Sequence, residues 1–159
     1  MTIYLVRHAK AGRRGEFADP DWLRPLTQAG QQQARGLLIQ LHTAKFQHIV
    51  SSPYVRCMET VVPLASNHGL AIEPHDALAE ESPLDVTMQL VSDHWETGAV
   101  LCSHGDIIPM ILGQFRSQGT DLGAAPKCEK GSTWILEGHF DGLVHARYVA
   151  PPTPPNAAQ

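Results

Sequence analysis

The sequence lacks most of the features that mark secreted and membrane proteins. It has three cysteines, an odd number without the spacing of a metal-binding motif, so the simplest expectation is a reducing compartment. No apolar stretch approaches the ~18 residues of a membrane span. Residues 1–7 lack the basic region and the long apolar run of a signal peptide. These absences predict a cytoplasmic protein that does not contact a membrane.

Positive charge is also scarce. The chain has 12 Lys and Arg against 16 Asp and Glu, a formal net charge of −4, which argues against binding to a nucleic-acid polymer. Arginines can still cluster locally around a small anion. With 159 residues, 43% of them hydrophobic, the chain can bury one core. We therefore expect one domain over residues 1–150 and a disordered Pro-rich tail over 151–159. The sequence carries no signal for an oligomeric state.

Short apolar runs alternate with helical patterns along the chain. A long polar loop is expected at 11–25. Helices are expected at 28–42 with Thr27 as N-cap, from Ser52-Pro53 to about 67, from about 85, and from Asp106 to about 115. Strands are expected at 3–6, 48–51, 71–73 and 98–103, with a hairpin of two strands at 132–137 and 143–149. This order predicts an α/β fold, a three-layer α/β/α sandwich with a mostly parallel central sheet.

Polar residues stand where three of these strands end. Arg7-His8 follows the first strand, Ser51-Ser52 leads from the second strand to Arg56, and Ser103-His104-Gly105 follows the fourth. In open α/β sheets, ligands bind beyond the carboxyl ends of the strands. We therefore expect these residues, about a hundred apart in sequence, to converge at one edge of the sheet.

The chemistry of such an edge suits phosphate. The planar guanidinium forks of Arg7 and Arg56 match phosphate oxygens. Neighbouring positive charge disfavours a second cation, so it lowers the pKa of a histidine. A neutral imidazole, as at His8 or His104, is a competent nucleophile towards phosphorus. A helix starting at Ser52 would add the positive end of its dipole.

Four ordered segments resemble the histidine phosphatase superfamily, which has the phosphoglycerate-mutase-like fold, and in particular its short phosphohistidine-phosphatase-like branch. The segments are Leu5-Val6-Arg7-His8-Ala9, Arg24-Pro25-Leu26-Thr27 with Gly30, Gln33 and Ala34, Ser51-Ser52-Pro53-Tyr54-Val55-Arg56 with Thr60, and Ser103-His104-Gly105. The resemblance runs from residue 3 to about 149. It implies a phosphatase that needs no metal or organic cofactor.

The resemblance also implies roles for individual residues. His8 would be the phosphorylated nucleophile, and Arg7, Arg56 and His104 would complete the phosphate pocket. A proton donor would lie in Leu78-Ala79-Glu80-Glu81, with Glu80 in register, although the short branch often lacks this acid. It therefore remains open whether Glu80, Glu81 or neither residue is the general acid.

Two positions depart from the family pattern. Ala9 stands where many members have glycine, which still leaves room for the backbone to approach phosphate. Arg14 stands where sugar-phosphate mutases have asparagine, which argues against a mutase. The segment from Lys127 to Trp134 is similar to the C-terminal domain of some actinobacterial Nudix hydrolases and hints at a nucleotide.

Several alternatives stay open. The substrate is either a phosphorylated small molecule, such as a nucleotide, or a phosphoprotein carrying phosphohistidine. A non-catalytic phosphate sensor or adaptor and a phosphotransfer mutase are the rival functions. A zinc site at His8 and His104 is disfavoured because two arginines would repel the metal. Arg13 and Arg14 fit a solvated loop better than a substrate contact. Packing is the default role for the three tryptophans and for Cys57 and Cys102, and surface positions are expected for the remaining histidines, among them His48 and His94.

Overall fold

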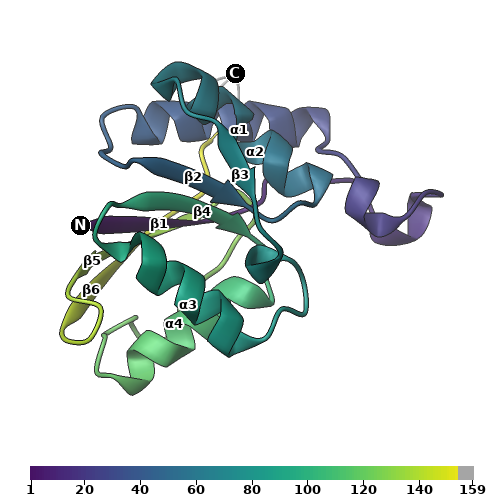
Figure 1. The fold of residues 1–159 in the computed structure, drawn as a ribbon. Coiled ribbons are helices and arrows are strands. Elements are labelled where there is room, and N and C mark those ends of the chain that lie inside the picture. Colours follow the sequence, from purple (N-terminus) through teal and green to yellow (C-terminus); the bar gives the residue numbers. More distant parts are fainter. Residues whose placement is uncertain (154–159) are drawn as a thin grey trace.

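A computed structural model describes residues 1–153 of the protein, which contain six strands and four α-helices (Figure 1). The strands are β1 (Thr2–Arg7), β2 (His48–Ser51), β3 (Ile72–Pro74), β4 (Ala99–Ser103), β5 (Thr133–Gly138) and β6 (Val144–Val149). The helices are α1 (Gln28–Leu41), α2 (Val55–His68), α3 (Leu84–Trp95) and α4 (Ile107–Ser117). Among residues 1–153, no helix is long and apolar enough to span a bilayer.

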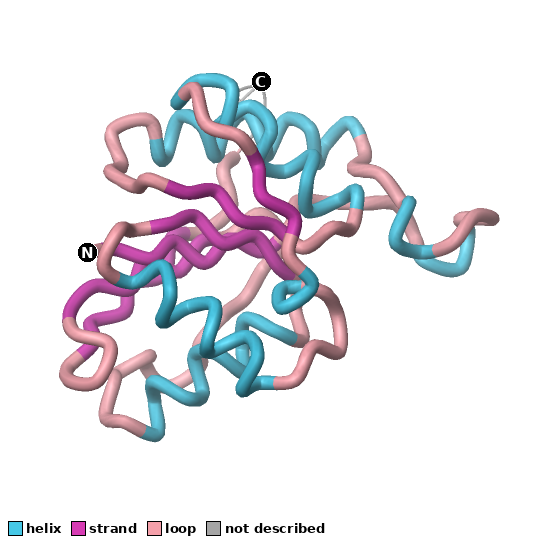
Figure 2. Tube along the Cα trace, viewed as in Figure 1, coloured by secondary structure: helices cyan, strands magenta, loops and turns pink. Residues whose placement is uncertain are grey.

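The strands form a single mixed sheet in the order β3-β2-β4-β1-β5-β6 (Figure 2). The four strands from β3 to β1 run parallel to one another, and β5 and β6 are antiparallel. Helices α1 and α2 cover one face, and α3 and α4 cover the other (Figure 1). The structure thus has the expected three layers, with the hairpin at one edge of the sheet.

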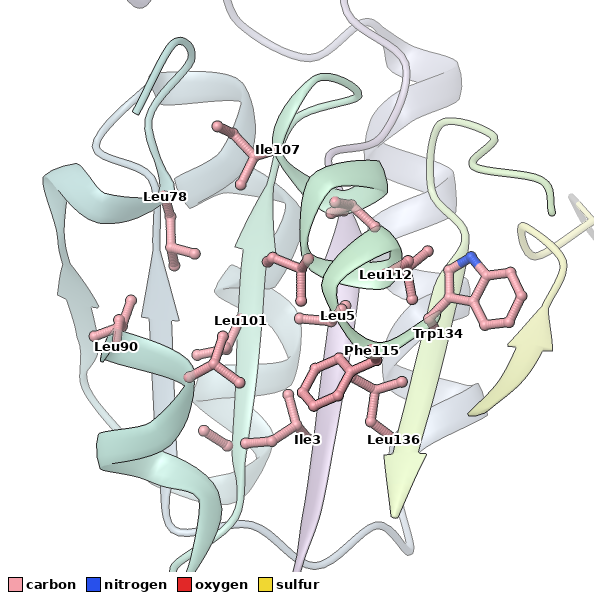
Figure 3. Packing of buried hydrophobic residues seen from close by; sticks show 14 of the residues in the cluster. Ile3, Leu5, Leu78, Leu90, Leu101, Ile107, Leu112, Phe115, Trp134 and Leu136 are labelled. Atoms are coloured by element: carbon pink, nitrogen blue, oxygen red, sulfur yellow. The ribbon is translucent and has the colours of Figure 1, made fainter. Parts of the chain in front are cut away.

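Alternation along the strands divides the core between the two faces, because successive side chains of a strand point to opposite sides. In β1, Ile3 and Leu5 pack with residues of α3 and α4. Tyr4 and Val6 pack with residues of α1 and α2. Figure 3 shows the first of these clusters, with Phe115 of α4 among the labelled side chains. Both faces of the central strands are therefore buried, as expected for parallel strands.

Most element boundaries match the sequence expectation, but the start of α2 does not. The helix begins at Val55 with Tyr54 as N-cap, so Ser52 and Pro53 are not its cap and first residue. Ser52 instead directs its hydroxyl to a histidine at the end of a neighbouring strand, described below. At the other end, Gly69 adopts a left-handed φ of 65° and ends α2 as expected.

The segment 151–159 is described only in part. Pro151 and Pro152 are half-buried, and Pro152 lies against Gly36 of α1, where a Cβ would clash with the proline ring. The rest of the tail for which disorder was expected, residues 154–159, lies outside the described residues.

Candidate active site

The backbone just after β1 is held on three sides. The His8 amide donates to the Ser103 carbonyl at the end of β4 (3.0 Å), and the His8 carbonyl accepts from the Gly131 amide (3.0 Å). The Ala9 amide donates to Thr60 Oγ1 of α2 (3.0 Å). Buried backbone groups need such partners. The peptide that carries His8 is therefore positioned by the sheet and by α2 together.

The proton on the His8 ring can be located from its hydrogen bond. Nδ1 lies 2.8 Å from the Ala9 carbonyl oxygen, which can only accept, so Nδ1 carries the hydrogen and Nε2 keeps its lone pair. Burial, together with smaller contributions from the neighbouring His104, Arg56 and Arg7, lowers the pKa of His8 to about 3, against the opposing effect of the Ala9 hydrogen bond. His8 is therefore neutral near pH 7.

Arg7 lies against the backbone at the end of β4. Its guanidinium packs so closely on Gly105 that a Cβ there would stand 2.7 Å from Cζ. Its Nη1 donates to the Cys128 carbonyl (2.5 Å). Its Nε has no hydrogen-bond partner within residues 1–153 although it is buried. An unsatisfied buried N–H of a cation suits an anionic ligand.

Arg56 has the most buried charge of the site, with no exposed surface. It comes from the first turn of α2, and its Nη2 donates to Glu80 Oε1 (2.8 Å) and lies 3.2 Å from Asp21 Oδ2. The Thr60 hydroxyl donates to the Arg56 carbonyl (2.6 Å). Thr60 thereby joins the Arg56 backbone to the peptide after His8, which explains the spacing of arginine and threonine on α2.

His104 lies at the end of β4, buried beside His8 with ring centroids 5.5 Å apart. Its Nε2 lies 2.8 Å from Ser52 Oγ, and its Nδ1 lies 3.6 Å from Glu80 Oε1. The Tyr54 ring packs edge-on against it at 4.7 Å. These contacts orient one ring nitrogen towards the site, where it can meet an oxyanion.

Glu80 is in the site, as the resemblance implied, but its charge state differs from that of a ready proton donor. Its carboxylate contacts Arg14 Nη2 and Arg56 Nη2, each at 2.8 Å. Burial acts to raise the pKa of Glu80, but the hydrogen bond from Arg14 and the charges of His104 and Arg56 lower it overall. Glu80 is therefore ionised in the unliganded protein.

The pocket beside these residues has a volume of about 510 Å³ and is rich in cations. Among the residues that line it are Arg7, His8, Arg14, Arg24 and Lys130. Lys130 is exposed, and its pKa is lowered by partial burial and by the positive charges of Arg7, Arg24 and Arg56. The carboxylates of Glu80, Glu81 and Asp106 line the pocket as well. Among the described residues that line it, cations still exceed carboxylates, which suits an anion.

The loop 11–25 contributes more to the site than its sequence suggested. Arg14, expected to be solvated, contacts Glu80. Arg24 is buried and contacts Asp21 Oδ1 (3.0 Å), and Asp21 also pairs with Arg56. Both Arg13 and Arg14 have exposed side chains, as expected of a solvated loop, and both also line the pocket described above. Sequence reasoning missed Asp21, whose only sequence signal is its place between two arginines in a loop.

The four residues expected in the phosphate pocket come together, with Glu80 beside them. Packing, the role expected for the tryptophans, holds for Trp95 and Trp134, which are buried in the core, whereas Trp22 is exposed. Chemically, the pocket wall offers the unprotonated imidazole nitrogen of His8 and the guanidinium of Arg7. The buried Arg56 and His104 do not line the pocket themselves but both contact Glu80, which does. Such a set can bind a phosphoryl group and attack it.

Comparisons with known proteins agree with this geometry. Residues 3–86 match the histidine phosphatase superfamily (branch 1). The chain is 29% identical over 163 residues to an 8-oxo-(d)GTP phosphatase of Mycolicibacterium smegmatis. The alignment covers 95% of this chain but 48% of that protein, so the chain spans about half the length of the curated relative.

Two solved structures have a similar fold. The protein histidine phosphatase SixA complexed with tungstate superimposes with a TM-score of 0.70 at 17% identity, covering 98% of this chain and 99% of that one. A mycobacterial glucosyl-3-phosphoglycerate phosphatase with inorganic phosphate gives 0.68 at 16% identity, covering 96% and 97%. At these identities the likeness concerns the fold, a phosphoglycerate-mutase-like α/β sandwich.

Proposed function

The chain belongs to the histidine phosphatase superfamily and is a phosphatase by family, and we propose that it works through a phosphohistidine intermediate on His8. The observation that carries the proposal is the His8 tautomer. Its Nδ1–H is occupied by the Ala9 carbonyl, so the free lone pair is on Nε2, and His8 is one of the residues that line the pocket. The substrate is a phosphate monoester or phosphoamidate.

The proposed reaction has two displacements at phosphorus. In the first, the bond from His8 Nε2 to phosphorus forms as the bond to the leaving group breaks. In the second, water attacks the phosphohistidine, inorganic phosphate leaves, and Nε2 regains its lone pair. Arg7, Arg56 and His104 bind the equatorial oxygens throughout and stabilise their charge. His8 does not have to lose a proton first, because it is neutral near pH 7.

We propose that substrate binding converts Glu80 into the proton donor. In the free protein, Glu80 Oε1 lies within reach of both Arg56 and His104, the groups that would hold a phosphate oxygen. A bound phosphate dianion would take over these contacts and add a nearby negative charge, which raises the pKa of a carboxyl group. Glu80 would then take up a proton that it can deliver to the leaving group.

Glu80→Gln tests this role. It should lower kcat for a substrate with a poor leaving group, such as an alkyl phosphate. It should spare kcat for p-nitrophenyl phosphate, whose leaving group needs no proton. Glu81→Gln, which changes a neighbouring carboxylate that also lines the pocket, serves as the matched variant. Equal losses on both substrates in Glu80→Gln would reduce Glu80 to a positioning role, and a leaving-group effect in Glu81→Gln alone would assign the donor to Glu81.

For the substrate class, we favour a phosphorylated small molecule with more than one phosphate, such as a nucleotide. Arg14, Arg24 and Lys130 line the pocket in addition to the residues proposed to hold the reacting phosphate. The pocket has more cations than a single phosphate group requires, and this surplus suits a polyphosphate. The name of the mycobacterial relative, an 8-oxo-(d)GTP phosphatase, agrees with this choice. Phosphohistidine on a protein is the second substrate class, and the superfamily resemblance favours it.

A panel of nucleoside diphosphates and triphosphates, sugar phosphates and a phosphohistidine protein separates these classes. For nucleoside diphosphates, Lys130→Met should raise KM, whereas KM for p-nitrophenyl phosphate should stay unchanged. Lys127→Met is the control, because Lys127 is an exposed residue of the same loop that does not line the pocket. Turnover of the phosphohistidine protein alone would favour the second class.

The intermediate itself is tested by rapid acid-free quench with a 32P-labelled substrate. We expect an acid-labile, alkali-stable phosphoenzyme in the wild type and in His145→Ala, an exposed histidine of β6. His8→Ala should yield none and should have no phosphatase activity. Full activity in His8→Ala would refute the proposal, and transfer of the phosphoryl group to an acceptor other than water would identify a mutase instead.

We further propose that residues 1–150 form the catalytic domain and that the protein resides in the cytoplasm. The sheet spans residues 2–149, and the three cysteines are free, as expected in a reducing compartment. Cell fractionation tests the location. A chain truncated after residue 150 that keeps full activity and stability would support the domain boundary.

A further inference from the structure

A second cluster of chemically active side chains lies at the opposite end of the sheet from the phosphate pocket. His48 begins β2, Glu73 lies in the short edge strand β3, and His94 lies in the last turn of α3. Each residue offers one ligand atom, and these three atoms all lie within 4.8 Å of one another. Within residues 1–153, these three side chains make up the one group of this kind.

The topology brings these side chains to one face. In β2, Ile49 packs towards α1 and α2 whereas Val50 packs towards α3 and α4, so His48 points to the same side as Val50. In β3, Ile72 packs on the α1 and α2 side of the sheet, so the next residue, Glu73, points to the α3 side. His94 meets them from α3 itself, and its ring lies edge-on to the His48 ring at 5.1 Å.

Two contacts prepare the cluster for a cation. His94 Nδ1 lies 3.0 Å from the Leu90 carbonyl oxygen, so it carries the hydrogen and leaves the Nε2 lone pair for a metal. Metal-binding histidines use this type of outer hydrogen bond to set their tautomer. His48 Nδ1 lies 3.5 Å from Glu73 Oε1, close to the separation of two ligand atoms bound to one tetrahedral zinc ion.

We propose that His48, Glu73 and His94 bind a divalent transition-metal ion of the zinc type. Imidazole nitrogens select such ions over Mg²⁺ and Ca²⁺, which prefer all-oxygen sites. Two imidazoles and one carboxylate provide three of the four ligands of tetrahedral zinc, with water as the fourth. The three ligand atoms lie at most 4.8 Å apart. Only small side-chain rotations are needed to bring them to the spacing of ligands around one zinc ion. Glu73 is exposed and free to make them.

A bound ion would tie the edge strand β3 to β2 and α3. The β3 strand is only three residues long, lies at the edge of the sheet and pairs with β2 alone, so an ion bound by Glu73 would add a tie on its α3 side. The proposed site lies about four strand residues, roughly 13 Å, before the Ser52 end of β2. It is therefore independent of the phosphatase chemistry, and its failure would leave the proposed function untouched.

Calorimetric titration of the metal-free full chain with Zn²⁺, in a phosphate-free buffer, tests the site. Loss of an outer hydrogen-bond partner already weakens metal sites by about 10–100-fold, so His48→Ala and His94→Ala should each weaken binding at least about tenfold. Co²⁺ should give the visible absorption bands of a tetrahedral nitrogen and oxygen site in the wild type and lose them in both variants. Mg²⁺ should give no heat.

His42→Ala is the matched control. The His42 ring also contacts a backbone carbonyl three residues earlier, but His42 lies outside the cluster and should leave Zn²⁺ binding unchanged. Zinc should raise the Tm of the wild type and of His42→Ala but not of His48→Ala. Absence of Zn²⁺ binding at millimolar concentration would overturn the proposal. Binding that persists in His48→Ala and His94→Ala but disappears in His8→Ala would equally overturn it, because the ion would then be at the phosphate pocket.

Discussion

Lowering the pH from 7 to 5 should destabilise the protein through His8. In the unfolded chain this imidazole has an ordinary pKa of about 6.5, whereas burial and the nearby cations lower its pKa to about 3 in the folded state. Between these values the unfolded state binds more protons than the folded state, so stability falls as the pH falls. The contribution is intact above about pH 6.5 and is lost progressively down to about pH 3.

The size of the effect follows from the two pKa values. At pH 5 the unfolded imidazole is about 1.5 pH units below its pKa, at about 1.36 kcal/mol per unit, while folded His8 has taken up almost no proton. Protonation of this residue in the unfolded chain therefore lowers the free energy of unfolding by about 2 kcal/mol between pH 7 and pH 5. The full loss, reached near pH 3, would be about 5 kcal/mol.

Urea unfolding at pH 7 and pH 5, in the wild type and in His8→Asn, isolates this term because the other eight histidines are common to both proteins. From pH 7 to pH 5, the free energy of unfolding of the wild type should fall by about 2 kcal/mol more than that of His8→Asn. Nitrogen NMR of the ring should show a neutral Nδ1–H tautomer down to about pH 4. A His8 titration midpoint near 6.5, with equal pH dependence in both proteins, would refute the assignment of a buried neutral nucleophile.

Three substitutions test the scaffold around the site. Gly105→Ala places a Cβ 2.7 Å from Arg7 Cζ, so kcat/KM should fall at least about tenfold through a displaced guanidinium, with little change in urea midpoint. Thr60→Val leaves the buried Ala9 amide without its acceptor and should cost about 1–3 kcal/mol in urea unfolding; an unchanged midpoint would contradict this. Phe115→Ala empties a fully buried position and should cost about 3–5 kcal/mol, while leaving the KM for p-nitrophenyl phosphate near wild type.

The fold was largely predictable because its signals are local. Apolar runs of strand length, helical periodicity and the glycine at position 69 place most elements within a residue or two of the structure. Convergence of His8 and His104 was also predictable, because parallel strands deliver their carboxyl ends to one edge. No geometry beyond strand order and direction was needed for that inference.

The error at the start of α2 has a non-local cause. Ser52-Pro53 has the local pattern of a helix N-terminus, but the Ser52 hydroxyl lies 2.8 Å from His104 Nε2, 52 residues away. The helix therefore starts after Tyr54. The contact of Arg14 with Glu80 was not foreseen for a similar reason, since it joins residues 66 apart, and no local pattern encodes such a pair.

By itself, then, the sequence determined which residues reach the edge proposed to bind phosphate, because strand order and period-two alternation follow from local patterns. The tertiary structure decided their protonation states. The free lone pair on His8, the ionised Glu80 and the buried charge of Arg56 each depend on burial and on partners brought from distant segments. Tertiary packing likewise brought His48, Glu73 and His94 together from three separate elements. Charge and desolvation act through space, so only the folded chain sets them.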